Sequence, residues 1–301
     1  MPNDGPAMTR IELAYAKVNL TLRVLGRRSD GYHELASLVA FADTSDTVTV
    51  TMLPAGNADR LTVTGPFGDG IAGENLLARA MALLRAGYPQ LPANAVHLEK
   101  HLPVAAGLGG GSADVAALLR IMRGLDAAGG ADIPWMKIAA QLGSDVPVCL
   151  ACRPALIQGR GERMSFVSAL PGMHAVLVNP RIPLSTASVF AALHAGPAPH
   201  SVADCRAPSF TRPDEVLSFM REHGNDMESA AIGLLPAIGE IKAVLTGQTG
   251  CLHAAMSGSG PTCFGMFASE AAARRAAAAI AAARPLWWVK PTRIIGTRRV
   301  D

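Results

Sequence analysis

The stretch of sequence that decides the fold is Pro103-Val104-Ala105-Ala106-Gly107-Leu108-Gly109-Gly110-Gly111-Ser112-Ala113. An apolar run with helical spacing, 115–125, follows it, and a strand-like segment, 96–98, precedes it. Glycine has no Cβ, so such a loop can turn tightly and bring its backbone close to a ligand. The helix that follows directs unpaired N–H groups and the positive end of its dipole into the same space. The sequence therefore predicts a phosphate-binding turn between a strand and a helix.

Three other glycine-rich loops fit this stretch less well. A Walker A loop carries a Lys after its glycines, and no Lys follows Gly111. A dinucleotide-binding loop nearly matches Gly107, Gly109 and Ser112, but Asp126 lies where the helix ends and not at the tip of a second strand. The loop of protein kinases belongs with a later His-Arg-Asp segment, which this sequence lacks. A glycine-rich turn without a ligand stays as the structural alternative.

The composition is that of a globular protein. The 301 residues suffice for one large domain or two ordinary ones, half of them are hydrophobic and 17% are charged. The 27 basic and 24 acidic residues give a formal net charge of +3 and are scattered, so we expect no nucleic-acid partner. There is no apolar run of transmembrane length and no signal-like N-terminus, so we expect no membrane partner and no secretion.

The cysteines favour a reducing, cytoplasmic location. They are five in number and irregularly spaced: Cys149, Cys152, Cys205, Cys251 and Cys263. The pair Cys149-x-x-Cys152 lies in an apolar, strand-like run with no second Cys or His pair nearby. We therefore expect buried thiols there and no metal or redox site.

Strands and helices alternate without a regular βαβ pattern, which favours an α+β fold. We expect strands at 11–25, 47–52, 60–63, 95–99, 174–179, 254–257, 263–267 and 287–295, of which 47–52 and 60–63 form a hairpin. We expect helices at 74–85, from 185 or 186 onward, at 227–245 and 270–283, and one that is capped by Asp132 and ends before Gly143. The segment 196–213 is rich in Pro, Ala and Ser and is predicted to be an irregular surface excursion.

Three segments, in order, resemble the motifs of one family, the GHMP kinases, which include galactokinase, homoserine kinase and mevalonate kinase. They are Ala16-Lys17-Val18-Asn19-Leu20, the phosphate-binding stretch, and Met256-Ser257-Gly258-Ser259-Gly260-Pro261-Thr262. Further segments resemble one branch of that family, which acts on a cytidine-diphosphate-linked alcohol in the non-mevalonate route to isoprenoid precursors. They are Gly26-Arg27-Arg28-Ser29-Asp30-Gly31-Tyr32-His33-Glu34-Leu35, Gly143-Ser144-Asp145-Val146-Pro147-Val148 and Gly224-Asn225-Asp226-Met227-Glu228.

The resemblance implies the architecture and the reaction. It implies an N-terminal domain, 1–155, similar to domain 2 of ribosomal protein S5 and carrying the ATP phosphate loop. It also implies a ferredoxin-like C-terminal domain, 156–301, with the active site between the two. The expected activity is an ATP-dependent small-molecule kinase that uses Mg²⁺, and the expected partner is a substrate that carries a cytidine diphosphate group.

Lys17 and Asp145 are the candidate catalytic residues. Lys17 lies in an apolar strand, where an ammonium group needs a partner, and Asp145 is the candidate partner. The alternative is an outward-pointing Lys on an edge strand. Asp145 follows a predicted helix, whose negative dipole end would make a carboxylate more basic. By resemblance it is the general base; its alternative role is a turn-forming Asp before a strand.

The candidate binding residues form two groups. By resemblance we expect ATP to contact Asn75 and Lys100, and the glycine-rich stretch adds Pro103, Gly107, Leu108, Gly109, Gly110, Gly111, Ser112 and Ala113. The Ser112 hydroxyl would touch a phosphate or Mg²⁺, or serve as a helix N-cap. We expect the substrate to contact Asn19, which shares a strand face with Lys17, and by resemblance Tyr32, His33, Gly258, Ser259 and Gly260. Tyr32 and His33 would hold the cytosine ring, and the glycine-rich loop 258–260 would close over the phosphates.

Two other functions remain open at this point. One is a GHMP kinase for a different alcohol, such as homoserine or mevalonate. The other is a nucleotide-binding protein without catalytic activity on the same fold.

Overall fold

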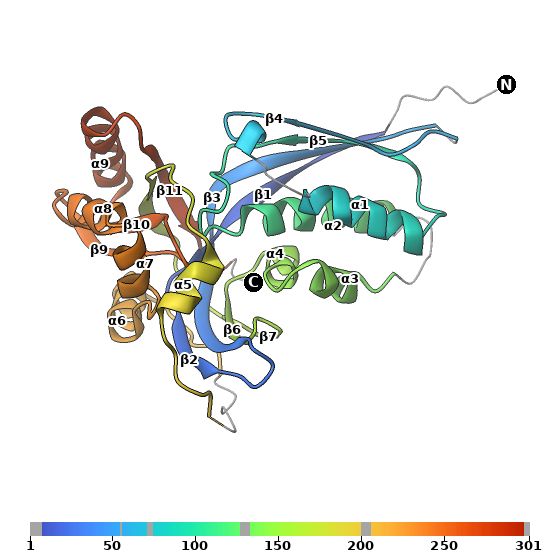
Figure 1. Ribbon diagram of the computed structural model, residues 1–301. Coiled ribbons are helices and arrows are strands. Elements are labelled where there is room, and N and C mark those ends of the chain that lie inside the picture. The colour runs from blue at the N-terminus through green and yellow to red at the C-terminus, as the bar shows by residue number, and fades with distance from the viewer. Residues whose placement is uncertain (1–7, 55, 71–74, 127–132, 200–205, 298–301) are drawn as a thin grey trace. The chain divides into compact units, whose positions relative to one another are not determined.

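A computed structural model describes residues 8–54, 56–70, 75–126, 133–199 and 206–297 (Figure 1). The chain divides into two compact units, each made of three segments. Unit 1 comprises Met1–Tyr15, Ser45–Val104 and Gly110–Ala151, and unit 2 comprises Ala16–Thr44, Ala105–Gly109 and Cys152–Asp301. The predicted domain boundary near Ala155 stays a prediction.

Unit 1 contains a sheet in which β5 (Asn94–Glu99) takes an inner position. β5 pairs antiparallel with the end of β3 (His33–Met52) and parallel with β4 (Arg60–Thr64), while β1 (Thr9–Asn19) also pairs with β3. The predicted hairpin of 47–52 with 60–63 is therefore wrong. β5 carries fully buried side chains, whereas β4 alternates exposed and half-buried ones, so the more apolar strand lies inside and β4 lies at the edge.

Four helices lie on one face of the unit 1 sheet (Figure 1). They are α1 (Leu76–Gly87), α2 (Gly110–Asp126), α3 (Trp135–Leu142) and α4 (Val146–Ala151), and a short 3₁₀ helix, η1, spans Gly68–Gly70. The helix predicted at 74–85 is confirmed as α1, with Asn75 as its N-cap. Five consecutive residues of α2, Val115 to Leu119, are buried, because α2 packs against α1, α3 and α4.

Of two further predictions in this part of the chain, the strand at 146–151 is wrong, and the cap at Asp132 lies outside the described residues. The apolar run 146–151, predicted as strand-like, is helix α4; a short, wholly buried apolar run has no periodicity that separates strand from helix. Pro147, in the first turn, is compatible with a helix start because the first N–H groups of a helix have no partner within it. Asp132 lies outside the described residues, and α3 begins after Pro134.

Unit 2 contains a ferredoxin-like arrangement. Its four strands are β8 (Met173–Asn179), β9 (Cys251–Met256), β10 (Cys263–Phe267) and β11 (Trp288–Ile295). They follow the order β11-β8-β10-β9, and every neighbouring pair is antiparallel. The helices α8 (Ala237–Thr246) and α9 (Glu270–Ala283) pack against this sheet around a common apolar core. This β-α-β-β-α-β order confirms the predicted α+β class and the predicted ferredoxin-like part.

The rest of unit 2 departs from the sequence expectations. The first half of β3 pairs with β2 (Arg23–Arg27) and with β6 (Ala155–Gly159), which forms a hairpin with β7 (Arg163–Phe166). The predicted strand 11–25 is thus two strands, β1 and β2, and β6 and β7 were missed. The predicted helix 227–245 is two helices, α7 (Glu228–Leu234) and α8, separated at Pro236, which cannot donate a backbone hydrogen bond.

Among the described residues between β8 and α7 there are two helices. α5 (Thr186–Ala192) starts where predicted, and Ser185 caps it by accepting a hydrogen bond from Ser188 N. α6 (Pro213–His223) was missed: Pro213 was read as the end of an irregular segment, but at the first position of a helix proline is well tolerated. Of the segment 196–213, residues 200–205 lie outside the described ones.

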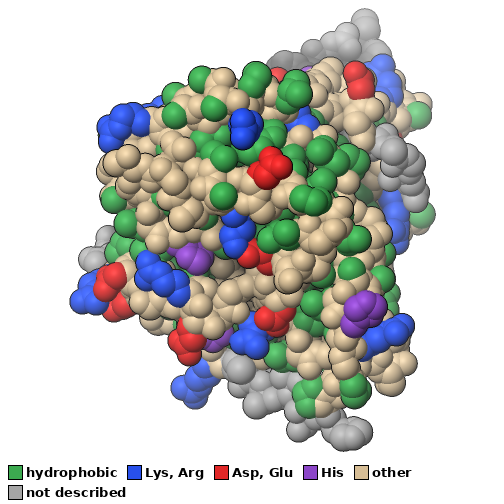
Figure 2. All heavy atoms as spheres, turned by 60° about the vertical axis from the view of Figure 1, so that its left-hand side comes forward, with side chains coloured by type: hydrophobic (Ala, Val, Ile, Leu, Met, Phe, Trp, Pro, Cys, Tyr) green, Lys and Arg blue, Asp and Glu red, His purple; other side chains and the backbone are tan. Residues whose placement is uncertain are grey.

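The described part of the chain contains no helix long and apolar enough to cross a membrane. It also contains no group of three or more His, Cys, Asp or Glu side chains that could hold a metal ion. Of the pair expected to be buried thiols, Cys149 is buried but Cys152 is only half-buried. Cys263 is buried, Cys251 is half-buried, and Cys205 lies outside the described residues. On the face drawn in Figure 2, basic and acidic side chains lie beside one another, so the charge of that face is mixed.

Candidate active site

Within unit 2, the middle of the predicted phosphate loop rests on the turn that joins β9 to β10. The Ser257 hydroxyl donates to the Gly107 carbonyl at 2.9 Å, and Thr262 N donates to the Ala106 carbonyl at 3.2 Å. Gly107 has a φ of +71°, and a Cβ placed on it would lie 2.4 Å from the Ser257 carbonyl oxygen. Only glycine fits there. The second and third motifs are therefore in direct contact.

The first motif meets the same loop. Lys17 N donates to the Leu108 carbonyl at 2.8 Å. Gly109 has a φ of +61°, and a Cβ on it would lie 3.1 Å from Lys17 Cε, so the Lys17 side chain packs closely under this glycine. Lys17 is only 5% exposed, which rules out the alternative of an outward-pointing Lys on an edge strand.

Asn19 presents an acceptor with no partner among the described residues. Its backbone N–H donates to Ser257 Oγ at 3.1 Å, and its Nδ2 donates to Ser37 Oγ at 2.7 Å. The Ser37 hydroxyl itself donates to the Thr21 carbonyl, so it must accept from Asn19, and this sets the orientation of the amide. The buried Asn19 Oδ1 is left unpaired, and a Cβ on Gly258 would lie 3.1 Å from it. An unpaired buried acceptor of this kind is costly and suits a hydroxyl donor of a ligand.

The turn 258–260 is held in place by contacts within unit 2. Gly258 and Gly260 have φ values of +58° and +80°, in the left-handed region that favours glycine. The Ser259 and Thr186 hydroxyls are hydrogen-bonded at 2.8 Å, and Ser259 is 8% exposed. The predicted closing of this turn over the phosphates stays a prediction.

Within unit 1, a buried charge cluster lies behind the start of α2. Lys100 Nζ donates to Asp46 Oδ2 at 2.5 Å and to Asp114 Oδ2 at 3.0 Å. Asp46 Oδ1 also accepts from the backbone N–H groups of His101 and Leu102. A Cβ on Gly110 would lie 3.2 Å from Lys100 Nζ, so the ammonium group lies directly behind the first residue of α2. Lys100 thus lies directly behind the start of α2, and its predicted contact with ATP stays a prediction.

The two carboxylates of this cluster are not equivalent. Burial, only partly offset by the charge of Lys100, raises the pKa of Asp114 to about 8. Burial acts to lower the pKa of Lys100, but the two carboxylates outweigh it and raise that pKa. Asp46 has the shorter contact to Lys100 and two backbone donors, whereas Asp114 Oδ1 is buried with no partner among the described residues. The Lys100 ammonium group therefore stabilises the Asp46 carboxylate, and the Asp114 carboxyl group is protonated.

The other unit 1 candidates occupy the following positions. Asn75 Oδ1 accepts from Leu77 N at 2.9 Å as the N-cap of α1. Ser112 is the third residue of α2 and so is not its N-cap, and nothing lies within 4 Å of a Cβ on Gly111. Pro103 and Ala113 are buried, as is Leu108, which belongs to unit 2.

Asp145 follows a helix, as predicted, but a second helix and not a strand comes after it. It lies between α3 and α4, and its carbonyl accepts the hydrogen bond of Cys149 N. Lys17 belongs to unit 2 and Asp145 to unit 1, so their pairing stays a prediction.

Tyr32 and His33 lie together in unit 2, where the turn after β2 enters β3. Tyr32 is 58% exposed, and the Arg160 guanidinium lies 4.9 Å from its ring centre. His33 is the first residue of β3 and not a loop residue, and it stacks on Phe190 with 4.4 Å between ring centres. Burial, with a smaller contribution from Arg27, lowers the pKa of His33. A neutral imidazole has one donor and one acceptor.

Buried Glu34 holds this turn in place. Its carboxylate accepts from Arg28 Nη1 at 2.6 Å and from Arg163 Nη2 at 2.5 Å. The Arg28 backbone N–H in turn donates to the Tyr32 carbonyl at 2.8 Å. Sequence reasoning missed Glu34, Asp114 and Ser257 as parts of the site, because each acts through a residue that is distant in sequence. The only available signal was that Glu34 and Ser257 lie inside recognised motifs and that Asp114 directly follows the phosphate-binding stretch.

The chain matches two family models. The model of the GHMP kinases N-terminal domain matches residues 75–153, and that of the GHMP kinases C-terminal domain matches residues 202–285. The chain belongs to the GHMP kinase family.

Two relatives and one solved structure are similar over nearly all of the chain. The 4-diphosphocytidyl-2-C-methyl-D-erythritol kinase of Rhodopseudomonas palustris is 46% identical, covering 95% of this chain and 97% of its own. The enzyme of that name from Parvibaculum lavamentivorans is also 46% identical, covering 93% and 96%. A crystal structure of 4-(cytidine 5'-diphospho)-2C-methyl-D-erythritol kinase is 34% identical with a TM-score of 0.74, covering 96% of this chain and 100% of its own.

Proposed function

We propose that the protein is an ATP-dependent kinase that phosphorylates the 2-hydroxyl of 4-diphosphocytidyl-2-C-methyl-D-erythritol, in the methylerythritol phosphate pathway of isoprenoid precursor synthesis. The observation that carries the proposal is the 46% identity, over nearly the full length, to relatives that bear this enzyme's name. The products are the 2-phosphate and ADP. A cytoplasmic location stays a prediction from the cysteine pattern.

In the proposed site, ATP places its terminal phosphates on the loop and on the start of α2. Support comes from the open space around Gly111 at the start of α2, because the first N–H groups of a helix have no partner within it. Mg²⁺ would be bound mainly by the ATP phosphates and by water, as is usual for this ion, so a cluster of protein carboxylates is not required. Its protein ligands are not assigned.

Asp145 is proposed as the general base, and Lys17 as the cation that orients the acceptor hydroxyl. Phosphoryl transfer needs little beyond positioning and charge neutralisation. Removal of the base in Asp145→Asn should lower kcat by about 10² to 10⁴-fold. The dissociation constant of an ATP analogue should stay the same. Turnover close to wild type in that variant would refute the assignment of the base.

The cytosine ring is proposed to contact the exposed Tyr32 ring and to be hydrogen-bonded by His33. The exposed aromatic face and the neutral imidazole support this role. Tyr32→Ala should raise KM for the cytidylated alcohol and leave KM for ATP unchanged. Equal KM values for both substrates in variant and wild type would contradict it. Asn19 Oδ1 is proposed to accept a hydrogen bond from the alcohol.

A coupled assay of ADP formation tests the proposal. The purified protein is supplied with ATP, Mg²⁺ and, in separate reactions, the cytidylated methylerythritol, homoserine, mevalonate and galactose. The proposal predicts that kcat/KM is highest for the cytidylated alcohol by several orders of magnitude. A preference for another alcohol would replace it with a different GHMP kinase activity, and ATP binding without turnover on any alcohol would favour a protein without catalytic activity.

A further inference from the structure

The segment 224–228 was singled out by its sequence, but none of the roles above uses it. In unit 2 it lies alongside the chain that links β1 to β2. Leu22 N donates to the Gly224 carbonyl at 2.9 Å, and Asp226 N donates to the Leu22 carbonyl at 2.8 Å. Asp226 Oδ2 accepts from Arg23 Nε at 3.0 Å and from Val24 N at 2.8 Å. The segment is thus fixed to the strand that follows the first motif.

On its other side, the segment holds the turn of the third motif through one amide. Asn225 Nδ2 donates both of its hydrogens to backbone carbonyls, those of Met256 and Gly258, each at 2.9 Å. Asn225 Oδ1 accepts from Met227 N at 3.0 Å. Every N–H of this amide is used, and a side chain without two donors on one atom cannot replace it.

The residue between these two carbonyls is Ser257. Its hydroxyl donates to the Gly107 carbonyl of the phosphate loop and accepts from Asn19 N. The direction of the Ser257 side chain depends on the backbone at 256–258, which Asn225 fixes. The Glu228 carboxylate adds to this support, because Oε2 accepts from Met256 N at 3.1 Å while Oε1 pairs with Lys242 Nζ.

We propose that Asn225 is a positioning residue for ATP: by fixing the Met256 and Gly258 carbonyls it orients Ser257, which in turn holds Gly107 in its phosphate-binding conformation. The inference deepens the proposed function and rests on it for the identity of the nucleotide. It concerns nucleotide binding only and is independent of which alcohol is phosphorylated.

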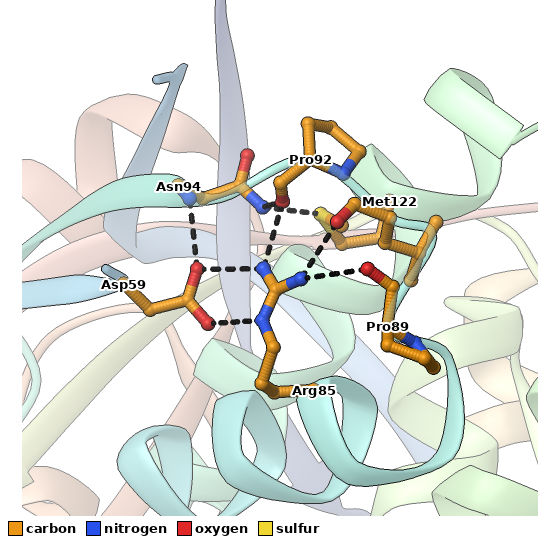
Figure 3. A network of polar contacts seen from close by, with 7 residues as sticks. Asp59, Arg85, Pro89, Pro92, Asn94 and Met122 are labelled. Carbon is orange, nitrogen blue, oxygen red and sulfur yellow. Dashed lines mark hydrogen bonds and ion pairs between the residues drawn. The ribbon is translucent and has the colours of Figure 1, made fainter. Parts of the chain in front are cut away.

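The test measures the binding of adenylyl imidodiphosphate with Mg²⁺ by calorimetry, with no alcohol present. Asn225→Asp keeps the acceptor for Met227 N but directs an oxygen at the two carbonyls, and Asn225→Ala removes the donor without adding charge. The matched control is Asn94→Asp in unit 1, where Asn94 Nδ2 likewise donates to a backbone carbonyl, that of Pro92, at 2.7 Å (Figure 3). The melting temperature of each variant is measured alongside.

Both Asn225 variants should raise the dissociation constant of the analogue by about tenfold, because the net free energy of one or two hydrogen bonds corresponds to such a change. Asn94→Asp should lower the melting temperature with binding unchanged. Ser257→Ala should also weaken binding. In the double variant with Asn225→Ala, the loss should be smaller than the product of the two single losses, because both act through one contact.

Unchanged analogue binding in folded Asn225→Ala would overturn the inference, as would equal losses in the Asn94 control or losses that multiply in the double variant. If the wild-type protein binds the analogue as expected but does not phosphorylate the cytidylated alcohol, the proposed function fails while the role of Asn225 stands.

Discussion

Gly107 and Gly111 lie four residues apart in the phosphate loop, but the space around them differs. At Gly107 the backbone has a positive φ and a Cβ would overlap the Ser257 carbonyl, whereas at Gly111 a Cβ would meet nothing. Gly107→Ala should therefore destabilise the fold by about 1–2 kcal/mol or more from backbone strain alone and weaken binding of the ATP analogue.

Gly111→Ala should keep the wild-type melting temperature and still weaken analogue binding, because its methyl group occupies the space proposed for a phosphate. Thermal unfolding and calorimetry on the two variants separate these effects. A Gly111→Ala protein that binds the analogue as tightly as wild type would place the phosphates elsewhere.

The protonation of Asp114 gives a prediction about pH. Its pKa is raised from 3.8 to about 8 in the folded protein, so between these values the folded state binds more protons than the unfolded state. The contribution of Asp114 to stability is therefore greatest below about pH 4 and is lost as the pH rises towards 8. Lys100 and Asp46 are the charged groups in contact with it.

Asp114→Asn cannot lose a proton, so its unfolding free energy should rise relative to wild type as the pH increases from 5 to 8. The relative gain should reach at most about 1.4 kcal/mol per pH unit. Denaturant unfolding at several pH values measures it. Parallel pH curves for variant and wild type would show that Asp114 is ionised throughout this range.

In unit 1, a single arginine joins α1 to the chain leading into β5 (Figure 3). Arg85 donates to both Asp59 oxygens at 2.9 and 3.0 Å, and to the carbonyls of Leu91 and Pro92 at 2.7 and 2.9 Å. Asp59 Oδ1 also accepts from Asn94 N at 2.8 Å. The network needs a planar group with several donors, which lysine does not provide.

Arg85→Ala should lower the free energy of unfolding by about 2 kcal/mol, since charged hydrogen bonds and buried carbonyls lose their partner. The exposed pair of Arg274 with Glu270 on α9 is the control, and Arg274→Ala should cost about 0.3 kcal/mol. Urea unfolding of both variants provides the comparison, and equal losses would mean that the network in unit 1 adds no stability.

Helices and strands that show a clear apolar periodicity or local capping signals in the sequence were predictable. Strand pairings between segments far apart in the sequence were not. The predicted helix 270–283 coincides with α9 because its alanines and its Ser269 cap are local signals. The partner of β4 was mispredicted because its parallel pairing with β5 depends on a strand about 35 residues further along the chain. Residues 146–151 form a helix that is buried at every residue but the last, so no alternation of apolar and polar residues revealed it.

At the scale of the whole molecule, those candidate site residues that lie in recognised sequence motifs were predictable. Lys17, Asn19 and Gly107 were found from sequence, and unit 2 brings them together around Ser257. Asn225 and Glu34 were inside recognised segments, but their roles depend on backbone groups far along the chain.

The most direct test of the account is to identify the product. The purified protein is incubated with ATP, Mg²⁺ and 4-diphosphocytidyl-2-C-methyl-D-erythritol, and the products are analysed by phosphorus NMR and mass spectrometry. The account predicts one new phosphate monoester on the 2-hydroxyl for each ADP formed. A phosphate on another hydroxyl, or ATP consumed without any phosphorylated alcohol, would contradict it.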